Sequence, residues 1–572
     1  MRSILMASFL AAICAWAAED GTKDNPLTIS SVQELVQFRN AVADSGTYKG
    51  VVLKNGGEGL FFKQTTDLDL SSLCGPQIGS WTSIGPFEGS YDGDNHEISN
   101  LYIDDSLGNV SNPGFFGTVF NNTQDTIFFE NMVFKNAFIR SSGILGTVMT
   151  QIVTGKAIVQ NNIIELTFKG SSKPQPNEHT SDYQVGGIMG NTVAEWVGFY
   201  NNTIKGSFTI LGKHDIILGG IIGALVDPGD LIGNVNEADI LIDGESYVNL
   251  GGLVGQLLYG TKIKNNINKG NITINVGNDY LFVGGLIGVD PSMSIKRQVV
   301  GNANYGKIEV SGGKAAEGGI YGLVTGNTNL TLDSCINYGD VIYHGKSQEL
   351  AQVGGIAGIL ETKQASRLEN KGKIYIENAT SPQVGGITGF VRPGAKSLDL
   401  TNSINSGDIT IKSDSLIQGW ISGIIGNTDN LDYVRLDSCT NKGNIVFEGT
   451  KDSILFVAAL ASVPPTTNLN TITSSNEGIV PERAPGRTNI NALAKAPKMH
   501  LQQLSNGRAI LEIPDVHDYS RVQVEMYSYN GKQVSIQQTQ VGSSIYLEGI
   551  PTGNYIIRAK TPFGAKTFRV KF

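Results

Sequence analysis

Short stretches in which apolar and polar residues alternate recur along most of the chain, and this period of two is the pattern of strands with one buried face. In NITI, Ile272 and Ile274 fall on one side of the strand, and in KIYI the same is true of Ile374 and Ile376. We therefore expect strands, not helices, with these isoleucines buried. The same pattern occurs in KIEV, DVIY, DITI and NIVF.

Glycine pairs divide the chain into repeats. The unit is two glycines, an aliphatic residue, any residue and a further glycine, as in LGGLVG. At spacings of 31 to 37 residues, the aliphatic position is occupied by Ile188, Ile221, Leu253, Leu286, Ile320, Ile356, Ile387 and Ile424. Two shorter units end at Gly117 and Gly146, so ten coils are expected. A nearly constant period of this length predicts a repeat architecture.

A second column follows the first by about 17 residues: an asparagine, then glycine or alanine two residues later, then a strand. It comprises Asn236, Asn268, Asn304, Asn337, Asn370, Asn405, Asn441 and Asn476. Asparagine tolerates a left-handed turn and can hydrogen-bond to its counterpart in the next coil, and the glycine permits a positive φ.

The two columns together predict an all-β fold, a right-handed parallel β-helix (β-solenoid) in which each strand pairs with the equivalent strands of the coils above and below. A helical solenoid of the same period is disfavoured, because each glycine inside a helix costs about 1 kcal/mol relative to alanine.

The two ends of the chain predict different structures. Ser31 and Glu34 form a capping-box pattern that predicts an N-terminal helical cap. The apolar stripe of this helix comprises Val32, Leu35, Val36 and Val42. Alternating strands around a turn at 529–532 predict a small C-terminal antiparallel β-sandwich. The expected division is 1–18 signal peptide, 19–110 cap and first coils, 111–478 repeats, 479–497 linker and 498–572 sandwich.

The first residues have the organisation of a secretory signal peptide. Arg2 supplies the positive charge, an apolar stretch runs from Ile4 to Cys14, and Ala15-Trp16-Ala17 provides small residues at the cleavage site. No later stretch reaches the roughly 18 apolar residues of a membrane span. We therefore expect an exported protein without a transmembrane segment in its mature chain, secreted or held at the outer cell surface.

Composition narrows the class of protein. Glycine accounts for 71 of the 572 residues, and the hydrophobic fraction of 40% is too high for a disordered chain. The chain has 18 prolines but no stretch with glycine at every third position, which excludes collagen. A net charge of -9 without a cluster of lysines and arginines argues against nucleic acid as the partner.

Three cysteines remain after the expected cleavage: Cys74, Cys335 and Cys439. Cys335 and Cys439 occupy the same position of the repeat, three repeats apart. Coils stacked at about 4.8 Å would separate them by roughly 14 Å, beyond the ~7 Å that a disulfide tolerates between Cα atoms. We expect both to be buried small apolar residues and not a bridge.

Two segments resemble known families. The recurring GG-aliphatic-x-G unit, with WTSIGPFEGSYDGDNHEISNLYID before it, resembles the GLUG-motif repeats of exported bacterial proteins over roughly residues 25–480. YSYNGKQV, LEGIPTGNYIIRAK and FRVKF resemble the C-terminal sorting domain of the type IX secretion route. The resemblances imply a parallel β-helix that secretion machinery carries across an outer membrane through the C-terminal domain, for release or attachment at the cell surface.

One group of side chains could carry catalysis. It comprises Asp67, Asp69, Asp92, Asp94, His96 and Glu97. Asp92 and Asp94 are the candidate catalytic residues of a carbohydrate-active β-helix enzyme, a polysaccharide lyase or hydrolase, or could bind calcium. The alternative is a turn in which the carboxylates cap backbone groups, and the buried strand pattern that follows at once favours it.

We expect no cofactor and no metal, because the other histidines and the glycine-rich stretches form no metal-ligand, nucleophile or phosphate-binding motif. Surface positions are expected for His179, His214, His344, His500 and His517.

Tyr305 and Tyr338 occupy the same turn position in adjacent repeats, and lysine takes this place at Lys269, Lys371 and Lys442. Aromatic side chains are the usual means of holding a glycan, so the tyrosine pair is the candidate binding surface. The alternative is two amphipathic side chains that cover a turn. The tryptophans expected to fill irregular coils are Trp81, Trp196 and Trp420.

The sequence thus favours a non-catalytic adhesion or binding protein whose partner is an extracellular glycan or another surface. A carbohydrate-active enzyme and a purely structural role in a surface layer or fibre remain the alternatives.

Overall fold

The computed structural model describes residues 18–481 and 500–571, apart from internal gaps. The gaps are 107–109, 111, 142, 171–182, 213, 245, 278–279, 292–294, 327–328, 346–349, 393, 395, 414–417, 429–430, 450–453, 465–466, 505–507, 513–520, 529–532, 541–543, 548–553 and 562–563. Most of the expected signal peptide, most of the expected linker and the turn at 529–532 therefore lie outside the described residues.

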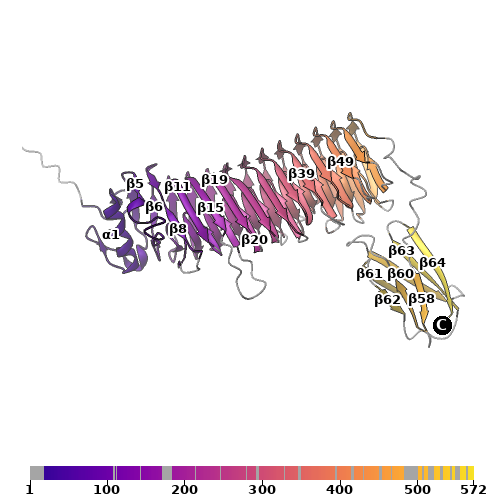
Figure 1. Cartoon of the computed structure of the whole chain (residues 1–572), viewed down its shortest axis with the longest axis horizontal. Coiled ribbons are helices and arrows are strands. Elements are labelled where there is room, and N and C mark those ends of the chain that lie inside the picture. The colour runs from indigo at the N-terminus through magenta and orange to yellow at the C-terminus, as the bar shows by residue number, and fades with distance from the viewer. Residues whose placement is uncertain are drawn as a thin grey trace, which may run out of the picture.

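Successive coils of chain stack into an elongated parallel β-solenoid (Figure 1), as the repeat predicts. One coil comprises β20 (His214–Gly219), β21 (Ile222–Leu225), β22 (Gly229–Ile232), β23 (Val235–Asn236) and β24 (Asp239–Gly244). In the next coil these strands pair in parallel with β25 (Ser246–Gly251), β26 (Val254–Leu257), β27 (Gly260–Lys264), β28 (Ile267–Asn268) and β29 (Ile272–Val276).

One side of the solenoid is a sheet of 14 strands, here called the long sheet. Its first half comprises β1 (Leu27–Ile29), β4 (Phe61–Gln64), β6 (Ser90–Asp92), β10 (Thr126–Glu130), β14 (Lys156–Gln160), β18 (Trp196–Tyr200) and β22. Its second half comprises β27, β32 (Arg297–Val300), β37 (Leu330–Asp333), β42 (Gln364–Ser366), β47 (Ser397–Thr401), β52 (Tyr433–Asp437) and β56 (Asn468–Ile472).

Three further stacks complete the coils. Two have ten strands each, one from β12 (Ile144–Gly146) to β55 (Ile454–Ala458) and one from β9 (Thr118–Phe120) to β51 (Ile425–Thr428). The last begins with β5 (Leu68–Asp69), β7 (Glu97–Ser99), β8 (Tyr102–Asp104), β11 (Val133–Ser141), β15 (Ile163–Gly170) and β19 (Thr203–Leu211). Because β19 pairs with both β23 and β24, this stack then continues as two ribbons, which end at β57 (Ser475–Asn476) and β54 (Ile445–Gly449).

The expected number of ten coils matches the two ten-strand sheets but is too low for the long sheet. Strands β1, β4 and β6 precede the first glycine unit, and β56 follows the last one. These rungs lack the glycine unit, so the repeat count could not detect them.

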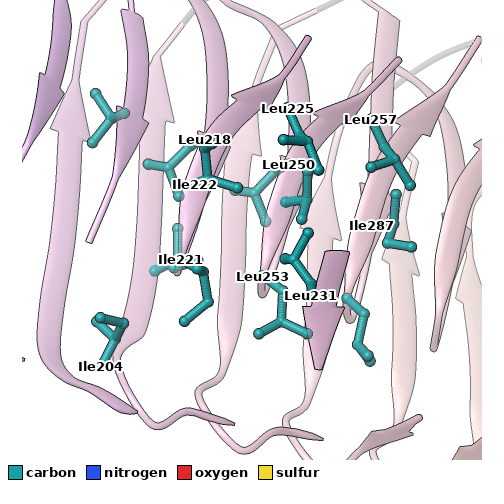
Figure 2. Close-up of a cluster of buried hydrophobic side chains, with 14 of the residues drawn as sticks. Ile204, Leu218, Ile221, Ile222, Leu225, Leu231, Leu250, Leu253, Leu257 and Ile287 are labelled. Carbon is teal, nitrogen blue, oxygen red and sulfur yellow. The ribbon is translucent and has the colours of Figure 1, made fainter. Parts of the chain in front are cut away.

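The aliphatic residues of the glycine units form a continuous core column, and all eight are fully buried. The backbone N–H of Ile221 donates to the carbonyl of Leu253 at 3.0 Å, and that of Leu253 donates to Leu286 at 3.0 Å. Figure 2 shows Ile221 and Leu253 in successive coils, with Leu218 and Leu250 on the neighbouring strands. Ile272, Ile274, Ile374 and Ile376 are also buried, as the alternation predicts.

The asparagine column is a buried hydrogen-bonded ladder, as expected. The side-chain N–H of Asn337 donates to Oδ1 of Asn370 at 2.9 Å and to the carbonyl of Gly339 at 2.8 Å, and the other rungs from Asn236 to Asn441 repeat this pair of bonds. The last rung, Asn476, is exposed and keeps, of this pair, only the bond to the carbonyl of Gly478. The expected left-handed conformation was wrong for this column, whose asparagines do not have positive φ.

The positive φ expected for the glycine two residues after each of these asparagines was also wrong. Gly306 and Gly339 do not adopt a positive φ. A Cβ at Gly339 would instead overlap the carbonyl oxygen of Gly306 in the preceding coil. The second glycine of each unit is restricted in the same way: a Cβ at Gly252 would lie 2.5 Å from Cγ of Asn268. The glycine and asparagine columns therefore touch inside the coil. Glycine is required at both positions because a Cβ there would collide with the neighbouring coil.

A second buried ladder lies two residues before the first. It comprises Asn162, Asn202, Asn234, Asn266 and Asn302. The residue before each rung has a positive φ, for example Asn201 and Asn265, so the left-handed turn occurs here. The N-x-N pattern at 234–236, 266–268 and 302–304 was the sequence signal for both ladders.

Cys335 and Cys439 continue the second ladder in later coils, and both are fully buried and free, as expected. Burial raises the pKa of each thiol to about 11. Both are therefore protonated, unreactive packing groups near neutral pH.

A helix forms at the N-terminal end, α1 (Val32–Ala43), followed by the short 3-10 turns η1 (Lys54–Gly56) and η2 (Leu70–Ser72). The Ser31 hydroxyl accepts from the backbone N–H of Glu34 at 3.1 Å, as the capping pattern predicts. The buried face differs in part from the predicted stripe: Val32 and Val36 are only partly buried. The buried residues of α1 are Leu35, Phe38, Ala41 and Val42.

Antiparallel strands follow in the C-terminal segment. One sheet comprises β58 (His500–Leu504), β59 (Arg508–Glu512) and β62 (Ser544–Leu547). The other comprises β61 (Gln533–Gln540), β60 (Arg521–Ser528), β63 (Asn554–Thr561) and β64 (Gly564–Lys571).

Candidate functional site

The acidic residues of the first coils each bond to local turn groups. Asp92 accepts from the backbone N–H of Asp94 at 2.9 Å and from the Asn131 amide at 2.9 Å. Asp94 pairs with Lys63, whose Nζ lies 3.1 Å from its carboxylate. Asp94 and Asn95 have positive φ, so this segment is the tight turn that the sequence predicts.

Asp67 and Asp69 lie in the next corner and act in the same way. Asp67 accepts from the backbone N–H of Glu97 at 2.9 Å and lies 3.3 Å from Nδ1 of His96. The Glu97 N–H, and then His96, hold the pKa of Asp67 below its ordinary value. Hydrogen bonding, first from Asn100, lowers the pKa of Asp69. A general acid needs a raised pKa, so these two carboxylates are suited to capping turns and not to donating protons.

No three His, Cys, Asp or Glu side chains within the described part of the chain lie close enough together to hold a metal ion. Of the histidines expected at the surface, His344 is partly exposed, between Glu309 and Glu377. His214 was wrongly placed: it is buried, with its ring edge-on to Tyr183. His179 and His517 lie outside the described residues.

Tyr305 and Tyr338 stack on adjacent coils, with ring centroids 4.4 Å apart and ring planes 4° from parallel. They are 49% and 36% exposed. The Lys371 ammonium lies 4.8 Å from the centroid of the Tyr338 ring. A sugar stacks on the face of a ring, yet Tyr305 covers one face of Tyr338 and Lys371 sits over the same ring. Each tyrosine ring thus has one face covered by the other, which favours a ladder that covers a turn.

The outer face of the long sheet carries a row of side chains that the repeat analysis did not identify. The row, here called the polar row, comprises Asp230, Lys262, Gln298, Thr331, Gln364, Asp399, Arg435 and Asn470, one from each successive strand. For most members the neighbouring residues in the strand are buried in the core, as Leu231 and Ile263 are. Exceptions are Thr261, at a register shift before Lys262, and the exposed last strand β56. The glycine and asparagine columns set the register of this sheet but carry no information about its outer residues.

The polar row contains two acidic and two basic side chains, so its charges balance in number. Lys262 Nζ lies 3.1 Å from the carboxylate of Asp230, and Arg435 lies 2.8 Å from that of Asp437. The Tyr433 hydroxyl donates to Asp399 at 2.9 Å. The row therefore offers hydrogen-bond donors and acceptors at the spacing of the coils, about 4.8 Å, without an excess of either charge.

An acidic side chain, Glu317, stands in the column of residues that directly precede the glycine pairs, where neighbouring coils have valine. It pairs in register with Val283 and Val353, is fully buried, and neither carboxylate oxygen has a hydrogen-bond partner. Desolvation by burial raises the pKa of Glu317 well above its ordinary value. A buried polar group without a partner costs on the order of 1–3 kcal/mol, so this coil is less stable than a coil with valine here.

We expect Glu317→Val to raise the free energy of unfolding at pH 7 by about 2 kcal/mol, which urea unfolding followed by circular dichroism measures. Burial raises the pKa of Glu317 in the folded state, so the wild-type protein loses stability as pH rises from the unfolded pKa of about 4.3 through the folded pKa. Below about 4.3 the carboxyl group is protonated in both states, and this loss is absent. The gain should therefore be smaller at pH 4. Glu309→Gln, at an exposed ion pair with Lys307, is the control and should change little. Equal gains at both pH values would contradict the assignment.

Comparison with known proteins gives little guidance. No family model matches the chain, and no solved structure matches it. A protein of Evansella cellulosilytica named "Putative Gly-rich membrane protein" is 30% identical over 111 residues, which are 19% of this chain and 11% of that protein. The chain thus spans about a tenth of that relative's length. Within the described residues, no helix has the length and apolar character needed to cross a membrane.

Proposed function

We propose that this protein is exported and binds an extracellular glycan along the outer face of its long sheet, without catalysing a reaction on it. The observation that carries the proposal is the polar row. Asparagine, glutamine, threonine and paired charged side chains satisfy the hydroxyls of a neutral polymer, which presents donors and acceptors but no net charge. A polyanion is disfavoured, because the row is charge-balanced and the chain carries a net charge of -9.

The sequence supports export. The signal-like residues 1–18, the resemblance of the repeats to GLUG-motif proteins and the resemblance of the tail to a type IX sorting domain point to the same compartment. The proposed organisation is a right-handed β-helix closed by α1 at one end and followed by a C-terminal β-sandwich that serves secretion. A packed helix at the first coil fits the need to cover an open end, because Phe38 lies 4.5 Å from Phe62 between ring centroids.

A glycan array and a whole-cell binding screen test the function. Gln298→Ala with Gln364→Ala should weaken binding of the recognised polysaccharide about tenfold or more, because each lost hydrogen bond is worth about 1 kcal/mol. The matched control is Thr273→Ala with Thr410→Ala, which should bind like the wild type. These threonines lie on the outer face of β29 and β49 (Ile409–Ser413), in the stack that continues as two ribbons after β19. Failure of the wild type to bind any polysaccharide or cell surface would reject the function.

A further inference from the structure

The polar row begins beside a pair of aromatic side chains on β18. Trp196 and Tyr200 lie on the same face of this strand with ring centroids 6.5 Å apart and ring planes inclined by 35°. Gly198 lies between them in the strand, at the row position that precedes Asp230. Trp196 was expected to fill an irregular coil, but it is partly exposed on a regular strand, whereas Trp81 and Trp420 are 1% and 5% exposed.

The absence of a side chain at Gly198 lets the two rings close over the strand. A Cβ there would lie 2.5 Å from Cη2 of Trp196 and 2.8 Å from the Tyr200 hydroxyl oxygen. The preceding rung presents Ile158, which pairs with Gly198 in register and is partly buried. Indole, phenol and isoleucine therefore form an apolar floor on the outer face of the long sheet.

A polar wall stands beside this floor on the next two rungs. The Asp230 side chain is 5% exposed, accepts from the Thr261 hydroxyl at 2.7 Å and pairs with Lys262 at 3.1 Å. Burial, and then the negative charge of Asp230, raise the pKa of Tyr200, so its hydroxyl stays protonated and can donate. An apolar floor next to a compensated set of donors and acceptors matches a pyranose ring, which has a C–H face and hydroxyl edges.

We propose that Trp196, Tyr200, Thr261 and Lys262, with the nearly buried Asp230 holding Thr261 and Lys262 in place, form a binding subsite for one uncharged pyranose residue. This inference rests on the proposed glycan-binding function and locates the aromatic contact at the start of the polar row. The ion pair between Asp230 and Lys262 disfavours a charged sugar, since it leaves neither charge unbalanced. Tyr305 and Tyr338 offer less ring surface for such a contact, because each ring covers one face of the other.

The test uses the full chain and short oligosaccharides of whichever polysaccharide the array identifies. Trp16→Phe is introduced into the wild type and every variant, because Trp16 of the expected signal peptide would also be quenched. Since Trp81 and Trp420 are buried, acrylamide quenching of tryptophan fluorescence then reports mainly on Trp196. Saturating oligosaccharide should protect Trp196 from quenching in the wild type. Trp196→Ala should weaken oligosaccharide binding about tenfold or more. Trp196→Phe should retain most of the affinity, Asp230→Asn should weaken it, and Tyr305→Ala should bind like the wild type.

The outcomes separate the two proposals. If the wild type binds no polysaccharide, the proposed function and the subsite both fail. If it binds but Trp196 stays equally quenchable and Trp196→Ala binds with unchanged affinity, the subsite is wrong and the function stands. If Trp196→Ala does not fold, the quenching experiment on the wild type and the affinity of Trp196→Phe decide.

Discussion

Asp290→Ala should lower the free energy of unfolding by about 3–5 kcal/mol, because it leaves the Arg297 guanidinium buried without its counter-ion. Both side chains of this ion pair are fully buried. Arg297 also donates to the carbonyl oxygens of Gly260 and Leu258, each at 2.7 Å. The guanidinium is thus anchored at one coil boundary by two backbone acceptors and cannot reach water without opening the coil.

Urea unfolding measures the loss, and hydrogen exchange locates it in the coils around residues 258–330. Asp290→Leu combined with Arg297→Met should recover most of the stability, because an apolar pair of similar volume often replaces a buried ion pair at little cost. If the double variant is as unstable as Asp290→Ala, loss of packing and not the orphaned charge explains the effect.

Gly339→Ala should destabilise the middle of the solenoid by about 3 kcal/mol, since the added methyl group is placed against a backbone that cannot repack. The Cβ would overlap the carbonyl oxygen of Gly306 and lie 3.0 Å from Nδ2 of Asn304, which is engaged in the asparagine ladder. Separating the two coils would break that ladder and the parallel pairing around it.

Gly46→Ala is the matched control, because its Cβ would meet no atom closer than 3.4 Å and Gly46 has no positive φ. It should change the unfolding midpoint little. Hydrogen exchange of the 300–345 region should rise in Gly339→Ala and stay at the wild-type level in Gly46→Ala. Equal protection in the two variants would mean that the coils are not in the close contact described.

The stacking itself could be predicted from the sequence because the residues that cause it recur at the same place in every coil. Asn337 and Asn370 occupy the same position in successive coils. The equal position makes them recognisable as a repeat in the sequence, and it also places their side chains within hydrogen-bonding distance. The positions of the glycines were predicted correctly, but the reason given for them, a positive φ, was wrong. Positive φ is a local property, whereas the overlap at Gly339 depends on where the neighbouring coil lies.

The candidate binding surface could not be predicted, because outward residues are free to vary between coils. Asp230, Lys262 and Gln298 share a row without sharing a residue type, so no repeat alignment groups them. Tyr305 and Tyr338 could be recognised in the sequence because the same residue type occupies the same outer position in adjacent coils. In the structure these two tyrosines stack on each other. Trp196 has no equivalent in the repeats, and only its place on β18, with Tyr200 across Gly198, puts it at the start of the polar row.

The most direct test of glycan binding along the long sheet is the dependence of affinity on the length of the glycan. The row from Gly198 to Asn470 spans nine rungs, and its eight intervals of about 4.8 Å give a length of about 38 Å. Isothermal titration with oligosaccharides of increasing length should show affinity that rises until the ligand reaches this length and then levels off. Affinity that is independent of length, or unchanged when Gln298 and Gln364 are both replaced by alanine, would contradict a polymer lying along the long sheet.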